Sequence, residues 1–156
     1  SSPHRGRPKA ANVLSFRYPE MKSLNATKNL YAGLKKTIEE SRRALRENKM
    51  KSYYIHFKEV DVCGHDGNYR EKVKMLELID KEFFGFLRGL RVEKLRLIVT
   101  GDHSTPCIHK AHSDDPVPLL FYGEGSDGVK EFAERACKKG SFGKLYGKDV
   151  LTVCQF

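Results

Sequence analysis

The stretch Lys94–Thr105, KLRLIVTGDHST, joins an apolar segment directly to a polar turn. The residues up to Thr100 are rich in Leu, Ile and Val, a composition that favours a β-strand packed within a sheet. Asp102 and His103 follow at once, and both residue types are common ligands of divalent metals. Adjacent side chains of an extended strand point to opposite faces, but they can converge where the backbone turns. The stretch therefore predicts a strand with ligand-type residues at its end.

Strand and helix patterns alternate along the whole chain. Segments rich in β-branched or aromatic residues predict further strands at 12–17, 52–57 and 117–122. Segments with apolar residues every three or four positions predict helices at 27–47, 69–87, 129–138 and 149–156. The apolar stripe of the second helix is expected to comprise Val73, Leu76, Ile79, Phe83 and Leu87. This alternation is typical of the α/β class, so we predict a mainly parallel sheet flanked by helices.

A second ligand-bearing segment follows the predicted strand at 52–57. It contains Asp61 and His65, and we expect a loop there because Gly64 and Gly67 can adopt backbone angles that other residues avoid. In such a loop the Asp and His side chains can turn toward one ion. Taken singly, an Asp near glycines is more often a turn residue, so the pattern matters more than any one position.

Ligand-type residues therefore stand in three loops, since His112 occupies a third loop before the strand at 117–122. In open α/β sheets, sites form beyond the carboxyl ends of the strands, and we expect these loops to meet there. Asp and neutral His suit Mn²⁺, Zn²⁺ and Co²⁺ better than Mg²⁺. The predicted metal ligands are Asp61, His65, Asp102, His103 and His112. The alternative, that they are ordinary turn and surface residues, is left open by spacing alone.

Three other polar residues are weaker candidates. His56 lies within a predicted strand and is expected to be a hydrogen-bonded core residue, whereas His109 is expected on an exposed loop. Ser104 follows His103, but the Gly-x-Ser-x-Gly context of a nucleophile elbow is missing, so a role within its loop is expected.

Composition limits the classes of protein that fit. The chain has 156 residues, 39% of them hydrophobic, which suits a folded domain. Its 29 basic and 20 acidic residues give a charge of +9, but the basic residues are dispersed and form no nucleic-acid motif. No apolar run is long enough for a membrane helix, and the four cysteines form no C-x-x-C pair. These features predict a cytoplasmic protein with no nucleic-acid or membrane partner.

Two long motifs contain the predicted metal ligands. The first is His56–Asn68, HFKEVDVCGHDGN, and the second is Thr100–Pro106, TGDHSTP, continuing through Lys110–Pro118 to Gly123. Both resemble motifs of the archaeal-type, 2,3-bisphosphoglycerate-independent phosphoglycerate mutases, a family of the alkaline phosphatase superfamily. The resemblance extends over Tyr53–Phe156. It implies an alkaline-phosphatase-like core, and a mutase that interconverts 2-phosphoglycerate and 3-phosphoglycerate in glycolysis and gluconeogenesis.

The resemblance also implies a site with two divalent metal ions, which could be Mn²⁺, Zn²⁺, Co²⁺ or Mg²⁺. By position, Asp61, His65 and His112 would hold one ion, and Asp102 and His103 would hold the other. In the family a serine takes the phosphoryl group from one hydroxyl of phosphoglycerate and returns it to the neighbouring one. The substrate is thus a small phosphorylated molecule, and no bisphosphoglycerate cofactor is needed.

The chain departs from the family pattern near its beginning. Residues 1–20 resemble a segment from the middle of the family and are expected to be partly loose, whereas 21–156 correspond to its C-terminal, metal-binding part. No counterpart of the nucleophilic serine is recognised, so we expect an incomplete core and no mutase activity from these 156 residues alone. Two alternatives remain: a truncated, non-catalytic metal-binding paralogue, and a metal-dependent phosphatase of the same superfamily. The sequence leaves the oligomeric state open.

Overall fold

The computed structural model describes residues 12–14, 26–91 and 94–156. The chain divides into two compact units, Ser1–Leu90 (unit 1) and Arg91–Phe156 (unit 2). Most of the predicted partly loose segment 1–20 lies outside the described residues, as do the predicted strand end at 15–17 and the predicted boundary at residue 20. Among the helices that are described, none has the length and apolarity to cross a membrane. No disulfide joins the cysteines of the described residues.

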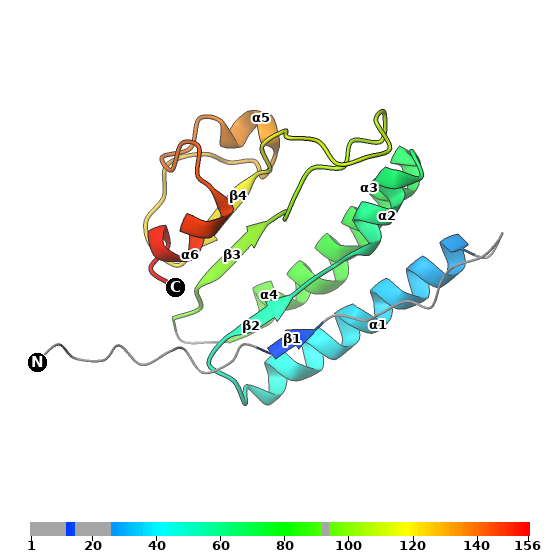
Figure 1. Ribbon diagram of the computed structural model, residues 1–156. Helices are drawn as coiled ribbons and strands as arrows, with labels where there is room; N and C mark the ends of the chain where they lie inside the picture. The colour runs from blue at the N-terminus through cyan, green and yellow to red at the C-terminus, as the bar shows by residue number, and fades with distance from the viewer. Residues whose placement is uncertain (1–11, 15–25, 92–93) are drawn as a thin grey trace, which may run out of the picture. The chain divides into compact units, whose positions relative to one another are not determined.

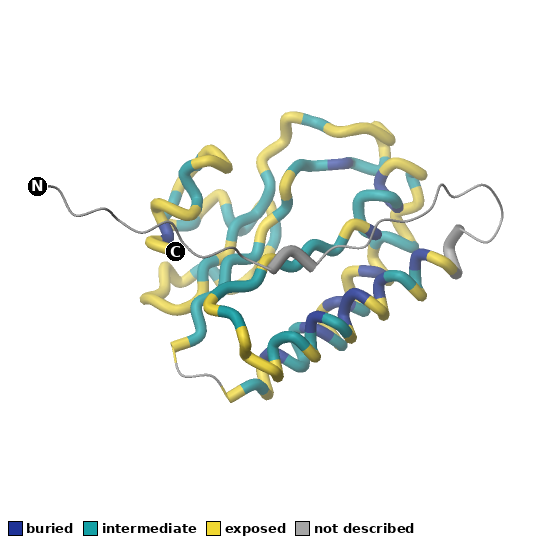
Figure 2. The backbone as a smooth tube through the Cα atoms, turned by 60° about the horizontal axis from the view of Figure 1, so that its bottom comes forward, coloured by how far each residue is buried: buried dark blue, intermediate teal, exposed yellow. Residues whose placement is uncertain are grey.

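Unit 1 is built around the long helix α1, Ala26–Glu47. Leu30, Leu34 and Ile38 recur every four residues and therefore share one face, where each is at most 3% exposed (Figure 2). The hydroxyl of Ser41 lies on the same buried face and donates to a main-chain carbonyl one turn earlier. The helix ends at Glu47, and the next residue, Asn48, has a left-handed φ of 47°. The sequence prediction of this helix is confirmed to within one residue.

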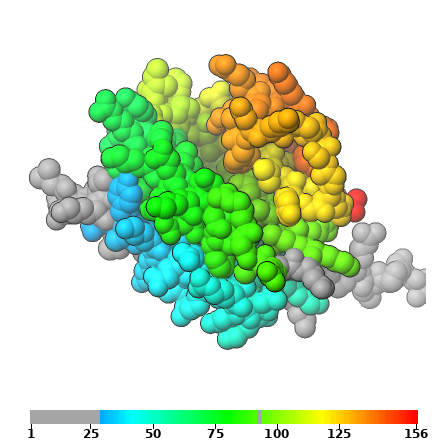
Figure 3. Space-filling model, turned by 180° about the vertical axis from the view of Figure 1, so that it is seen from behind, coloured from blue at the N-terminus to red at the C-terminus, as the bar shows by residue number. Residues whose placement is uncertain are grey.

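A second helical run packs against α1. It consists of α3 (Tyr69–Leu78), the π-helix η1 (Ile79–Phe84) and α4 (Gly85–Gly89). The side chain of Asn68 caps its start by accepting a hydrogen bond from the Glu71 backbone N–H at 3.2 Å. In Figure 3 the side chains of α1 (cyan) adjoin those of this run (green). The predicted helix at 69–87 is thus confirmed as a continuous run that includes a π segment.

The apolar stripe of this run differs from the predicted one. Val73 and Leu76 are each 50% exposed, whereas Met75 is fully buried. The buried positions are spaced by four residues throughout: Met75, Ile79, Phe83 and Leu87. Each four-residue step overshoots a turn of α-helix by about 40°. The wider turn of a π-helix reduces that drift, so the π segment suits a buried stripe with this spacing.

Residues expected to form a glycine-rich loop are mostly helical instead. Helix α2 spans Glu59–His65, and Gly64 is a buried residue inside it. Only Gly67, with a φ of 69°, needs the conformational freedom expected of both glycines. The loop prediction was wrong because burial of Cys63 and Gly64 in unit 1 outweighs the low helix propensity of glycine.

Two short strands of unit 1 form a parallel pair. Strand β1, Asn12–Leu14, pairs with β2, Tyr53–Ile55, with Val13 opposite Tyr54. Helix α1 lies between them in the sequence and provides the long crossover that parallel strands require (Figure 1). This is the only parallel pairing among the described residues.

The strands of unit 2 run in opposite directions. Strand β3, Leu97–Thr100, pairs antiparallel with β4, Leu119–Tyr122, with Thr100 opposite Leu119. The described residues therefore show a mixed α/β structure with two separate strand pairs, and the predicted mainly parallel sheet is not seen. The intervening residues 101–118 contain no helix, so the chain simply reverses instead of making a crossover.

The rest of unit 2 contains only short helices. They are α5 (Glu134–Cys137), the 3₁₀-helix η2 (Gly147–Asp149) and α6 (Val150–Val153). The predicted helix at 129–138 was too long because Asp127 accepts a hydrogen bond from the backbone N–H of Val129 at 3.0 Å. That local bond stabilises a turn and competes with helix formation. Asp127 also accepts from the Ser141 backbone N–H at 2.8 Å, and these hydrogen bonds lower the pKa of its carboxyl group.

Arg96 attaches the C-terminal residues to the strand pair. Its guanidinium donates to the main-chain oxygens of Cys154 and Gln155, the latter at 2.8 Å. It also lies 5.4 Å from the ring centre of Phe121 and 5.8 Å from that of Phe156. Cys154 is 1% exposed, and burial raises the pKa of its thiol.

Candidate metal centre

Helix α2 places two ligand-type side chains on one face. Asp61 and His65 are four residues apart, close to one helical turn, so their side chains lie side by side. The Nε2 atom of His65 is 3.5 Å from Oδ1 of Asp61. The His65 side chain is 43% exposed and that of Asp61 is 24% exposed, so both side chains are partly accessible to solvent. The helix thus achieves the convergence that the sequence analysis assigned to a loop.

Unit 2 contains a second Asp–His pair directly after β3. The Nε2 atom of His103 is 3.4 Å from Oδ2 of Asp102, although the two residues are adjacent in the chain. The backbone turns after Thr100, where the strand ends, and this allows both side chains to approach each other. The other Asp102 oxygen, Oδ1, accepts a hydrogen bond from the His103 backbone N–H at 3.1 Å.

His112 lies beside this second pair. Its ring stacks on that of His103, with the ring centres 3.6 Å apart and the planes inclined by 30°. The loop is closed by a bridge in which the Ser113 backbone N–H donates to the Ser104 carbonyl at 3.0 Å. Unit 2 therefore brings together Asp102, His103 and His112 from the two ends of one loop.

The two Asp–His pairs fit a divalent metal by distance as well as by chemistry. Ligand nitrogen and oxygen atoms lie about 2.1 Å from Zn²⁺, and two of them at a tetrahedral angle are therefore about 3.4 Å apart. The observed N–O separations are 3.5 Å for Asp61 and His65, and 3.4 Å for Asp102 and His103. A carboxylate and an imidazole held at this spacing could share one ion with little rearrangement.

The two weaker histidine candidates, His56 and His109, are not part of these pairs. His56 follows β2, is half-buried and meets the Tyr54 ring edge-on at 6.2 Å. His109 is exposed on the turn that begins at Pro106, as predicted.

Sequence reasoning did not single out Thr105. This residue is 5% exposed, and its Oγ1 atom lies 3.1 Å from Nδ1 of His103. The only signal in the sequence was a hydroxyl-bearing residue two positions after a candidate ligand. Such residues are common in loops, so the sequence could not indicate its burial.

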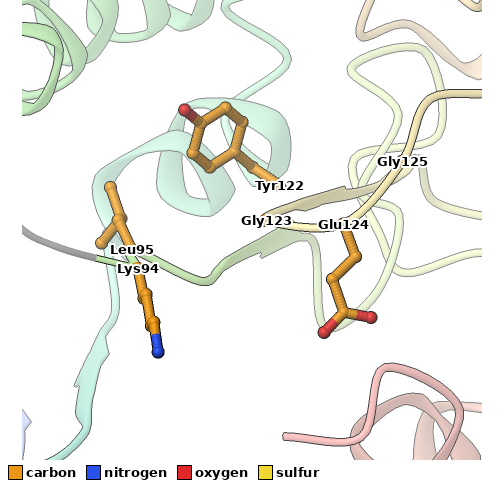
Figure 4. Close-up of a pocket in the computed structure, with 6 residues that line it drawn as sticks. All are labelled: Lys94, Leu95, Tyr122, Gly123, Glu124 and Gly125. Carbon is orange, nitrogen blue, oxygen red and sulfur yellow. The ribbon is translucent and has the colours of Figure 1, made fainter.

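A separate hollow of about 390 Å³ lies at the other end of the strand pair of unit 2. Lys94 and Leu95 line it from the approach to β3, and Tyr122–Gly125 line it from the end of β4 (Figure 4). In the antiparallel register Leu97 faces Tyr122, whereas the Asp102–His103 pair follows the opposite end of β3. This hollow is therefore not part of the candidate metal centre.

An α/β chain with two such pairs has the ligand chemistry of a metalloenzyme. The chain belongs to the metalloenzyme superfamily, because a family model of that description matches residues 16–153. The matched range includes every predicted ligand.

Several proteins that are similar to this chain in sequence are named as enzymes. A 2,3-bisphosphoglycerate-independent phosphoglycerate mutase of Thermococcus gammatolerans is 40% identical over 102 residues, which cover 64% of this chain and 25% of that protein. A probable enzyme of the same name from Thermotoga neapolitana is 35% identical over 156 residues, covering 88% of this chain and 38% of the relative. The chain thus spans well under half of the length of these relatives.

A solved structure shows a similar fold. It is the PH0037 protein of Pyrococcus horikoshii, which is 36% identical, with a TM-score of 0.66. The similarity covers 81% of this chain and 37% of that protein.

Proposed function

We propose that this chain is the metal-binding part of a cofactor-independent phosphoglycerate mutase, which interconverts 2-phosphoglycerate and 3-phosphoglycerate. The observation that carries the proposal is the 35–40% identity to proteins of that name, in a chain with two Asp–His pairs at metal-ligand spacing. In this proposal the parallel pair β1 and β2 would belong to the mainly parallel sheet of an alkaline-phosphatase-like core.

The proposed ligands fall into two sets. Asp61, His65 and His112 would hold one divalent ion, and Asp102 with His103 would hold the second. Imidazole and carboxylate together favour Mn²⁺, Zn²⁺ or Co²⁺ over Mg²⁺. The second set offers fewer ligands, so we expect weaker binding there.

The reaction requires a residue that accepts the phosphoryl group, and in this proposal that residue is a serine. Divalent ions at such a site would activate the serine hydroxyl and stabilise negative charge on the phosphoryl oxygens. The contribution of this chain is to hold the ligand side chains at the observed spacing. Ser104 takes part through its main chain in the bridge to Ser113, which supports a structural role for it.

The charge of the chain suits the proposed substrate. With 29 basic and 20 acidic residues, the chain carries a net positive charge that attracts a small phosphorylated anion. We propose a role in the cytoplasm, and we propose neither a nucleic-acid nor a membrane partner.

Phosphoryl transfer and phosphate hydrolysis differ in the group that accepts the phosphoryl group. Returning the phosphoryl group to the neighbouring hydroxyl requires an acceptor side chain in line with phosphorus. Without such a serine, water is the available acceptor, and the 156 residues alone would release inorganic phosphate slowly rather than form 2-phosphoglycerate. A metal-dependent phosphatase would show that activity as its main reaction.

The test compares two preparations. The naturally expressed polypeptide is identified by intact mass and peptide mapping, and the chain Ser1–Phe156 is prepared beside it. Each receives 3-phosphoglycerate with Mn²⁺ or Co²⁺, and 2-phosphoglycerate and free phosphate are measured separately. We expect 2-phosphoglycerate from the natural polypeptide, with loss of activity in His65→Ala.

The other possible results of this assay would each favour a different function. Free phosphate as the main product of the natural polypeptide would favour a phosphatase, and no turnover would favour a non-catalytic metal-binding protein. Formation of 2-phosphoglycerate by the 156-residue chain that disappears in Ser104→Ala would make Ser104 the acceptor.

A further inference from the structure

We propose that Thr105 is a positioning residue that holds the ring of His103 so that its Nε2 atom faces a divalent cation. The inference rests on the proposed role of Asp102 and His103 as ligands. Its basis is the 3.1 Å distance between Thr105 Oγ1 and His103 Nδ1. Thr105 is only 5% exposed, so water competes little for this contact.

The His103 ring is restrained on three sides. Thr105 contacts Nδ1, Asp102 Oδ2 lies 3.4 Å from Nε2, and His112 stacks on one face with the ring centres 3.6 Å apart. Rotation of the ring would break at least one of these contacts. The ring is thereby oriented before any ion binds.

The contact at Nδ1 also decides which nitrogen can coordinate a metal. A neutral imidazole carries its proton on one nitrogen and a lone pair on the other. With a cation on Nε2, the ring proton is on Nδ1 and the Thr105 hydroxyl oxygen, 3.1 Å away, is placed to accept it. Without the cation, Nε2–H can donate to the Asp102 carboxylate while the Thr105 hydroxyl donates to Nδ1, so Nδ1 is occupied in either case. A metal-bound histidine is usually oriented in this way by a partner at its other nitrogen.

The local structure explains why a threonine suits this position. The Ser104–Ser113 bridge fixes the backbone next to Thr105. A β-branched side chain has few χ1 rotamers, so its hydroxyl keeps a defined direction. Valine has the same shape without the hydroxyl, whereas serine keeps the hydroxyl without the extra methyl group. The two substitutions therefore separate the hydrogen bond from the packing.

The test uses the 156-residue chain as wild type, Thr105→Val and Thr105→Ser. In zinc-loaded, ¹⁵N-labelled protein, long-range ¹H–¹⁵N spectra report whether the His103 Nδ1 proton is protected from exchange with water. We expect slow exchange of this proton in wild type and Thr105→Ser, and fast exchange in Thr105→Val, which lacks the hydroxyl acceptor. Zinc is then titrated by calorimetry, and the weaker binding step should fall about tenfold or more in Thr105→Val. Thr105→Ser should stay close to wild type.

Two results would overturn the inference about Thr105 while leaving the proposed metal centre in place. One is fast exchange of the His103 Nδ1 proton in the zinc-loaded wild type. The other is zinc binding that is equally strong in wild type and Thr105→Val. If Thr105→Val does not fold, the exchange rate of the Nδ1 proton in the zinc-loaded wild type still decides the matter. Absence of zinc binding by the wild type would instead overturn the proposed metal centre, and the inference with it.

Discussion

His65 lies one helical turn after Asp61 on α2, and its Nε2 atom is 3.5 Å from the Asp61 carboxylate. A short helix therefore sets the spacing of this pair, and the pair does not depend on a flexible loop. Because both side chains project from a regular backbone, the cost of arranging them for an ion is small. A similar spacing recurs at Asp102 and His103, where Nε2 is 3.4 Å from the carboxylate.

The packing of unit 1 predicts a large effect at the centre of α1. Leu34 is 0% exposed, so Leu34→Ala would leave a cavity and lower the free energy of unfolding by about 2–5 kcal/mol. Urea unfolding followed by circular dichroism measures this change. Lys35→Ala, on the exposed side of the same helix, is the control and should change stability by about 0.5 kcal/mol or less. Equal effects of the two changes would show that the assigned inner face of α1 is wrong.

Asp127 predicts a pH dependence of stability in unit 2. Hydrogen bonds from Ser141 and Val129 lower its pKa below the ordinary value of 3.8. Because the folded-state pKa is lowered, the ionised carboxylate stabilises the fold at pH values above the ordinary pKa. This contribution is lost as the pH falls through the lower, folded-state pKa. The difference in melting temperature between wild type and Asp127→Asn should therefore be largest near neutral pH and shrink below about pH 4. Asp114→Asn, at an exposed loop position, is the control. A difference that does not vary with pH would contradict the assignment.

The contacts of Arg96 predict the reactivity of a buried thiol. Arg96→Ala removes the hydrogen bonds to Cys154 and Gln155, and such bonds to a charged group contribute about 1.5–3 kcal/mol. Local opening should become easier, and alkylation of Cys154 should speed up by about tenfold or more. Mass spectrometry of the Cys154 peptide measures the rate, with Arg91→Ala at an exposed position as the control. An unchanged rate in Arg96→Ala would mean that other contacts hold the C-terminal residues in place.

The sequence predicted some elements closely and others poorly, for physical reasons. Helix α1 was predicted well because Leu30, Leu34 and Ile38 give a strong helical period over a long segment. Helix α2 was missed because it is short and contains Gly64, and its formation depends on burial within unit 1. The antiparallel direction of β3 and β4 was also missed, since strand patterns do not encode the direction of pairing.

The sequence indicates candidate ligands but not their geometry. Ligand-type residues after apolar strands point to Asp61, His65 and the pair after β3, and their role as ligands stays a prediction. The sequence could not show that Asp61 and His65 share a helical face, or that His103 stacks on His112. The role of Thr105 depends on burial and on one interatomic distance, neither of which a sequence pattern specifies.

Calorimetric titration of the metal-free chain with Zn²⁺ or Mn²⁺ measures whether the proposed ligands bind a divalent ion. His65→Ala removes one proposed ligand, and His109→Ala removes an exposed histidine outside the proposed set. We predict that wild type and His109→Ala bind metal equally well, and that His65→Ala loses tenfold or more in affinity, about 1.4 kcal/mol or more. Failure of the wild type to bind either metal, or unchanged binding in His65→Ala, would contradict the account.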